Sequence, residues 1–92
     1  MISLKVMAFT SIKEAMGGEE FNLEFTEDPT LGDLLTMLRD YYNLPEKLFD
    51  GEDITKHLFV LINGRLSSLL GGVDAILKDG DEIALLPPAG GG

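Results

Sequence analysis

The C-terminal segment holds the arrangement in this chain that most clearly points to covalent chemistry. It reads Leu86-Pro87-Pro88-Ala89-Gly90-Gly91-Gly92. Because glycine has no side chain, the final glycines leave the terminal carboxylate of Gly92 unshielded and let the backbone enter a narrow cleft. Pro87 and Pro88 restrict φ and favour an extended chain. Such a segment is suited to delivering the carboxylate into the active site of another protein, although a frayed end is the common alternative at chain termini.

No other residue near this segment offers a catalytic group. The sequence contains no cysteine, its single histidine is His57, and no serine follows Ser68. A carboxylate is ionised at neutral pH and is a poor electrophile until it is activated. Activation and catalysis are therefore expected from partner proteins. The acids of residues 45–56 lack the spacing of a calcium loop, so we expect no bound metal and no bound cofactor.

Composition indicates one small soluble domain. The chain has 92 residues, of which 45% are hydrophobic, and this is enough for a single modest core. No apolar run reaches the roughly 18 residues that cross a membrane, and the N-terminus lacks the pattern of a secretory signal. Together with the absence of cysteine, these features predict a cytoplasmic protein without a membrane segment.

The charge is strongly acidic. Sixteen acidic residues against seven basic ones leave a formal net charge of −9. This charge repels phosphate backbones, so binding to nucleic acid is not expected. An acidic surface favours a basic protein partner, while the simpler alternative is that the acids keep a small domain soluble.

The first half of the chain predicts two strands and one main helix. Residues 2–9 and 21–25 each show a period-two pattern, which indicates two half-buried strands that pair antiparallel. Residues 11–16 favour a short helical turn between them. Thr30 and Asp33 have the spacing of a capping box at the start of a helix. That helix carries one apolar stripe, which consists of Leu31, Leu34, Leu35, Leu38 and Tyr42.

The second half predicts three further strands. The apolar run 58–62 leads into Asn63-Gly64, a strong hairpin signal, and we expect the returning strand over 65–70. A turn at 78–81 precedes the last strand, 82–86. Because the residues of this strand are apolar at successive positions, we expect it in the middle of the sheet with both faces covered.

The element order is strand, strand, helix, strand, strand, strand. A lone amphipathic helix must bury its stripe on one face of the sheet, so the fold class is α+β. Two central strands at the ends of the chain fit best side by side and parallel. We therefore predict a β-grasp, or ubiquitin-like, domain over residues 1–86, with a mixed sheet of about four to five strands packed on one main helix. Residues 87–92 form an extended tail.

The chain resembles the sulfur-carrier family of ubiquitin-like proteins, and within it most closely the small subunits of molybdopterin synthase. The resemblance is carried by three segments. They are Val60-Leu61-Ile62-Asn63-Gly64-Arg65, Leu77-Lys78-Asp79-Gly80-Asp81-Glu82-Ile83 and Leu86-Pro87-Pro88-Ala89-Gly90-Gly91-Gly92. Ala89 and Gly90 depart from the commoner residues of the family tail, but Gly91-Gly92 is intact.

The resemblance implies a defined chemistry for Gly92. Its carboxylate would be adenylated with ATP by a ubiquitin-activating-type enzyme, which consumes the ATP, and sulfur from a donor protein would then produce a thiocarboxylate. In the family this sulfur passes to a pterin precursor in the large subunit of molybdopterin synthase. Pro87, Pro88, Ala89, Gly90 and Gly91 would form the tail that binds the partner. The chain would be a non-catalytic subunit that carries sulfur.

Three alternatives stay open. The chain could be a ubiquitin-like modifier of proteins, a sulfur carrier of the thiamine type, or a ubiquitin-like interaction module with a chemically idle tail. A carrier is expected to bind its partner through a patch on the sheet and through the tail together. An idle module would need only the patch.

Overall fold

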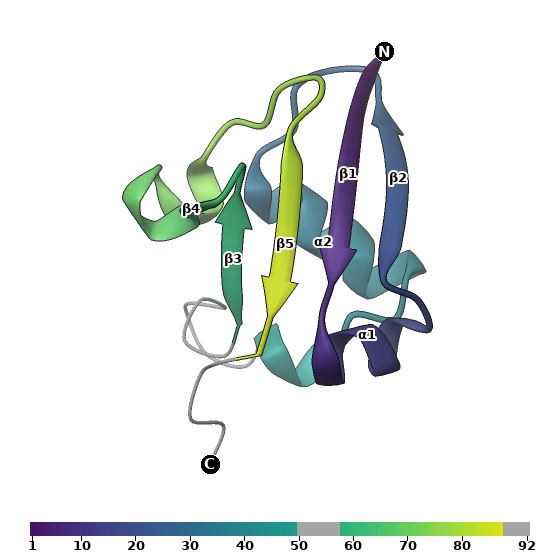
Figure 1. The fold of residues 1–92 in the computed structure, drawn as a ribbon. Helices are drawn as coiled ribbons and strands as arrows, with labels where there is room; N and C mark the ends of the chain where they lie inside the picture. The colour runs from purple at the N-terminus through teal and green to yellow at the C-terminus, as the bar shows by residue number, and fades with distance from the viewer. Residues whose placement is uncertain (50–57, 88–92) are drawn as a thin grey trace.

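A five-stranded mixed sheet with one long helix on one face makes up the domain (Figure 1). The computed structural model describes residues 1–49 and 58–87. The elements in chain order are β1 (Ile2–Ala8), α1 (Thr10–Met16), β2 (Glu20–Phe25), α2 (Leu31–Tyr41), the 3-10 helix η1 (Glu46–Phe49), β3 (Phe59–Ile62), β4 (Arg65–Leu66), the 3-10 helices η3 (Ser67–Leu69) and η4 (Gly72–Asp74), and β5 (Glu82–Leu86).

The strand order is β2-β1-β5-β3-β4. The first and last strands pair in parallel, with Val6 opposite Ile83, and the other neighbours are antiparallel. This arrangement confirms the predicted α+β β-grasp fold. It also confirms the pairing of the strands at the two ends of the chain, and it places β5 between β1 and β3.

The core lies between the sheet and α2. Alternate residues of β1 point toward the helix, as the alternation predicted for that strand requires. Alternate residues of β5 point the same way. The side chains with almost no solvent exposure include Leu4, Val6, Leu31, Leu34, Leu35, Leu38, Val60, Ile83 and Leu85. Truncating a leucine of such a core costs about 2–5 kcal/mol of folding free energy.

The start of α2 is a capping box, as predicted. The Thr30 hydroxyl accepts a hydrogen bond from the Asp33 backbone N–H at 3.1 Å, and the Asp33 carboxylate accepts one from the Thr30 N–H, also at 3.1 Å. Together they satisfy two backbone donors that the helix itself leaves unpaired. The capping box fixes where the leucine stripe begins and therefore how it faces the sheet.

The predicted strand over 65–70 is wrong beyond Leu66. The chain turns into η3 after two residues, and the Leu70 N–H donates to the Ser67 carbonyl at 2.9 Å. This local bond replaces the ladder that a longer strand would need, and Leu69 is left 78% exposed. The apolar residues of this segment were therefore a misleading strand signal.

Two smaller predictions have mixed outcomes. The helical turn over 11–16 is confirmed as α1, which begins one residue earlier. In the connection expected to be irregular over 45–56, residues 46–49 form η1 instead. Residues 50–57, which include His57, lie outside the described residues.

Asn63 and Asp81 clamp the β3–β4 turn to the start of β5. The Asn63 amide donates to the Asp81 carboxylate at 2.9 Å and its oxygen accepts from the Glu82 N–H at 2.9 Å. The second Asp81 oxygen accepts from the Lys78 N–H at 2.8 Å. Asn63 itself has a positive φ of 52°, as the predicted Asn-Gly hairpin requires. Two of the sequence segments that carried the family resemblance thus hold the sheet together.

Substitutions at Asn63 should distinguish the contribution of the clamp to stability from that of the backbone conformation. Asn63→Gly keeps the positive φ but removes both side-chain hydrogen bonds, and we expect the free energy of unfolding to fall by roughly 1–2 kcal/mol. Asn63→Ala also places a Cβ at positive φ and should cost about 1 kcal/mol more. Urea denaturation measures both changes. Wild-type stability in the glycine variant would show that the clamp contributes nothing.

Candidate functional site

The tail begins at the end of the central strand. Pro87 follows β5 directly and is half-buried, and it is the tail residue that the structure describes. The other predicted tail residues, which are Pro88, Ala89, Gly90, Gly91 and Gly92, lie outside the described residues.

Neighbours on both sides hold the end of β5. On one side the Phe9 N–H donates to the Leu85 carbonyl at 3.1 Å. On the other side Phe59 of β3 lies opposite Leu86. The base of the tail is thereby fixed relative to the sheet.

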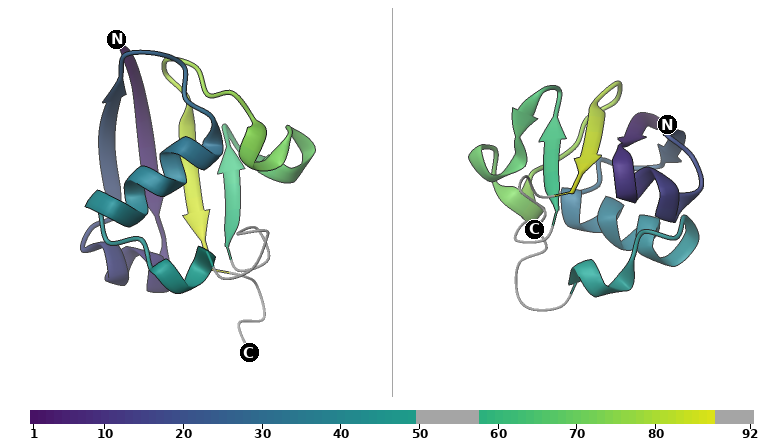
Figure 2. Two further views of the ribbon diagram at one scale, coloured as in Figure 1. Left: turned by 180° about the vertical axis from the view of Figure 1, so that it is seen from behind. Right: turned by 60° about the horizontal axis from the view of Figure 1, so that its bottom comes forward.

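One face of the sheet is open. Helix α2 covers the opposite face (Figure 2), and no helix or strand among residues 1–49 and 58–87 lies across this one. Although Ala84 is itself only 9% exposed, elements of the described part of the chain cover only one face of the last strand, and not both as predicted. Its apolar residues at successive positions have a different reason, because Ala84 and Leu86 point to the open face while Ile83 and Leu85 enter the core.

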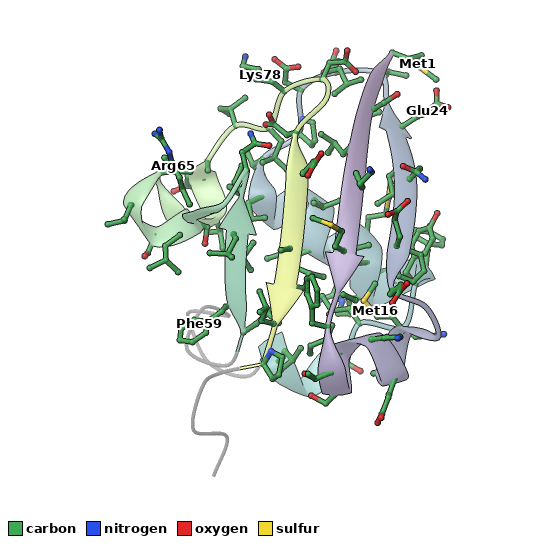
Figure 3. All side chains as sticks on the ribbon, in the orientation of Figure 1. Met1, Met16, Glu24, Phe59, Arg65 and Lys78 are labelled. Carbon is green, nitrogen blue, oxygen red and sulfur yellow. The ribbon has the colours of Figure 1, made fainter. Side chains whose placement is uncertain are left out.

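Apolar side chains gather on the open face. The strand pairing places Met7 beside Ala84, Ala84 beside Leu61 and Leu61 beside Leu66, which makes a row across four strands. The next position along the sheet adds Leu86 and its neighbour Phe59, which Figure 3 shows beside the start of β3. Phe9 continues the extended backbone of β1 on the other side of Leu86. We call these residues the open-face patch: Met7, Phe9, Phe59, Leu61, Leu66, Ala84 and Leu86.

The patch surrounds the point where the tail leaves. Phe9 and Phe59 are each 42% exposed and Leu66 is 43% exposed, so much of this apolar surface meets water. Toward β2 and the start of β5 the same face becomes polar, with Lys5, Glu20, Asn22, Glu24 and Glu82. A contiguous apolar patch bounded by polar residues is typical of a protein-binding surface. A binding patch on the sheet was expected from the sequence, but none of its residues was predicted, although the unbroken apolar runs in 58–62 and 83–86 were the available signal.

The part of the chain that the structure describes offers neither a metal site nor a membrane-spanning helix. No three or more His, Cys, Asp or Glu residues gather there as a metal site, and no helix there is long and apolar enough to span a membrane. Within the same residues, every buried side-chain nitrogen or oxygen has a hydrogen-bond partner. The tail and the patch around its base are therefore the candidate site.

Neighbouring leucines test the difference between the two faces. Leu85 is fully buried in the core and Leu86 is half-buried on the open face. We expect Leu85→Ala to lower the free energy of unfolding by about 2–5 kcal/mol and Leu86→Ala by less than about 1.5 kcal/mol. Chemical denaturation of the two variants, which lose the same atoms, gives the comparison. Equal losses would mean that the open face is part of the core.

Comparison with known proteins gives one matching family. The model of the ThiS family matches residues 6–92. Two proteins of Haloferax volcanii are similar over nearly the whole chain. Small archaeal modifier protein 3 is 32% identical over 99% of this chain and 100% of its own length. Small archaeal modifier protein 1 is 33% identical over 91% of this chain and 94% of its own.

Solved structures agree with the fold. Small archaeal modifier protein 1 of Methanosarcina acetivorans has a TM-score of 0.77 and 32% identity, covering 100% of this chain and 98% of its own. A Pyrococcus furiosus protein assigned as subunit 1 of a molybdopterin converting factor has a TM-score of 0.75 and 26% identity, covering 97% and 100%. A complex of subunits 1 and 2 of the molybdopterin-converting factor of Helicobacter pylori matches with a TM-score of 0.62 and 27% identity, covering 99% and 100%.

Proposed function

The chain belongs to the ThiS family of ubiquitin-like sulfur carriers, and from that premise we propose that it carries sulfur on the Gly92 carboxylate for molybdopterin biosynthesis. The observation that carries the proposal is the position of the open-face patch around the base of the tail. A carrier needs a surface that docks on the partner and a thin chain that enters the partner's active site. Here both start from the same end of β5.

The reaction would take place in two steps on partner proteins. In the first, a carboxylate oxygen of Gly92 attacks the α-phosphorus of ATP on an activating enzyme, and pyrophosphate leaves. In the second, hydrosulfide delivered by a donor protein attacks the carbonyl carbon, the bond to AMP breaks, and loss of a proton leaves a thiocarboxylate. Adenylation supplies the leaving group that a bare carboxylate lacks. The thiocarboxylate sulfur would then attack a pterin precursor in the large synthase subunit.

The domain's own contribution would be docking and orientation. The hydrogen bonds on both sides of β5 fix the direction in which Pro87 leaves, and a restricted proline loses little conformational freedom when the tail is bound. The open-face patch would supply the apolar area of the interface. The net charge of −9 favours partners with basic surfaces around an apolar centre.

The solved complex of subunits 1 and 2 of the Helicobacter pylori factor supports a large synthase subunit as one partner. The activating enzyme and the sulfur donor are the other partners that we propose, and all of these steps would take place in the cytoplasm.

Protein modification is the second candidate function. It is favoured by the two Haloferax volcanii relatives, both of which are named as modifier proteins. The two functions share adenylation of Gly92 and differ in the acceptor. Mass spectrometry of cell extracts decides between them, because a modifier would be found with Gly92 in isopeptide linkage to lysines of other proteins.

Intact-mass measurement tests the carrier chemistry. Incubation with ATP, an activating enzyme of the same organism and a sulfur donor should raise the mass by the difference between one sulfur and one oxygen atom. Deletion of Gly91 and Gly92 should abolish the gain and leave the melting temperature unchanged. An unchanged mass of the intact protein with every activating enzyme of that organism would refute the proposal.

Charge placed on the patch should block docking without unfolding the domain. We expect Phe59→Glu to weaken binding to the large synthase subunit or the activating enzyme by at least about 100-fold, since a charge would be buried in an apolar interface. Thr36→Glu is the matched control, because Thr36 is exposed on α2 behind the sheet. Calorimetry measures the affinities and circular dichroism checks the fold. Equal affinities of the two variants would place the interface elsewhere.

A further inference from the structure

Strand β2 has a free edge. It is the first strand in the order β2-β1-β5-β3-β4 and pairs with β1 on one side. None of the described strands pairs with its other side. Figure 1 shows β2 at the margin of the sheet, with β1 and β5 between it and β3. An unpaired edge presents backbone donors and acceptors to which another extended chain can add.

The register identifies the groups that face outward. The Ala8 N–H donates to the Glu19 carbonyl at 2.9 Å, so residues 8 and 19 form a hydrogen-bonded antiparallel pair. Because such pairs alternate along a ladder, Phe21, Leu23 and Phe25 direct their backbone groups to β1. The N–H and C=O groups of Glu20, Asn22 and Glu24 therefore point away from the sheet.

Beside this edge lies a half-buried apolar border on the helix side. Phe21 and Phe25 of β2, with Met37 and Tyr42 from the helix side, are partly buried and pack against the core. The rings of Phe21 and Tyr42 meet edge to face, with centroids 5.5 Å apart. We call these four residues the β2–α2 seam. A strand added at the edge would continue the pleat and place every second side chain along the seam.

The other side of the edge is acidic. Glu20 and Glu24 are exposed on the open face, where the alternate side chains of an added strand would lie, and Figure 3 shows Glu24 at the outer margin of β2. Past Phe25 lies an open hollow of about 270 Å³. It is lined by Phe25, Thr26, Glu27, Asp28, Pro29 and Asp33; Asp28 is already paired with Lys78 at 2.7 Å, and Asp33 caps α2. Opposite charges across strands are favourable and like charges are not.

These observations select one kind of partner. We propose that the β2 edge binds, by strand addition, an extended segment of another protein in which apolar and basic side chains alternate. The apolar side chains would cover the seam, and the basic ones would face Glu20, Glu24 and the acidic hollow. A second copy of this chain is disfavoured because its own edge carries the same carboxylates and its net charge is also −9.

The site is separate from the candidate sulfur-carrying site. The β2 edge borders the open-face patch at Met7, which pairs with Glu20, but β1 and β5 lie between it and Phe59 and the base of the tail. A partner could therefore occupy the β2 edge while the tail is bound in an active site or joined to another protein. The proposal does not depend on any chemistry at Gly92.

Titration of the isotope-labelled protein with a short capped peptide that alternates lysine and valine tests the proposal. We expect the largest amide shifts at Glu20, Asn22 and Glu24, with slowed hydrogen exchange of these N–H groups. A capped peptide that alternates glutamate and valine should bind at least about tenfold more weakly. Shifts confined to the open-face patch, or no shift at millimolar peptide, would overturn the proposal.

Two sets of variants separate strand addition from general charge attraction. Asn22→Pro removes an outward N–H at an edge position where proline is tolerated and should weaken binding of the lysine peptide by about tenfold or more, whereas Asn22→Thr should bind like the wild type. The Glu20→Lys, Glu24→Lys double variant keeps every backbone group and should reverse the preference toward the glutamate peptide. Unchanged binding in Asn22→Pro, or an unchanged preference in the double variant, would contradict the proposal.

Discussion

The structure depends on the pairing of β5 on both sides. Because β5 lies between parallel β1 and antiparallel β3, its inward side chains, Ile83 and Leu85, complete the core under α2. The same pairing sets the place and direction at which Pro87 leaves the domain. A strand at the margin of the sheet could fray, and the direction in which Pro87 leaves would then vary. A central strand cannot move without breaking the hydrogen bonds to both of its neighbours. Tail geometry is therefore tied to the stability of the whole domain.

The residues that carried the family resemblance divide into two groups with different physical roles. Asn63 and Asp81 bond the β3–β4 turn to the beginning of β5, at the end of the strand remote from Pro87. The glycines and prolines of the tail belong to the other end. The hairpin and turn signatures identify the family because they build the sheet. The proposed chemistry is confined to the tail, and the open-face patch, which we propose as the surface that recognises partners, lies between the two.

Much of the fold could be predicted because alternation and capping are local signals. The period-two pattern of residues 2–8 and the spacing of Thr30 and Asp33 both report contacts that the structure confirms. Residues 67–70 were misread as strand because an exposed apolar side chain, such as that of Leu69, looks in sequence like one that is buried. The same ambiguity is the reason why an open apolar face of the sheet was not predicted. The apolar residues of β5 were expected to need cover on both sides, and sequence alone does not say whether that cover belongs to the same chain.

Parallel pairing of β1 with β5 also has a practical consequence for handling the protein. Parallel strands begin at the same end of a sheet, so the chain starts where β5 starts. There the Ser3 N–H donates to Asp79 at 2.7 Å and Met1 is 79% exposed. Figure 1 marks the N-terminus at the end of the sheet opposite the arrowhead of β5. An affinity tag or fluorophore joined ahead of Met1 would project away from the tail across the full length of the sheet. The amino terminus is thus an attachment point that leaves Pro87 and the open-face patch around it unobstructed.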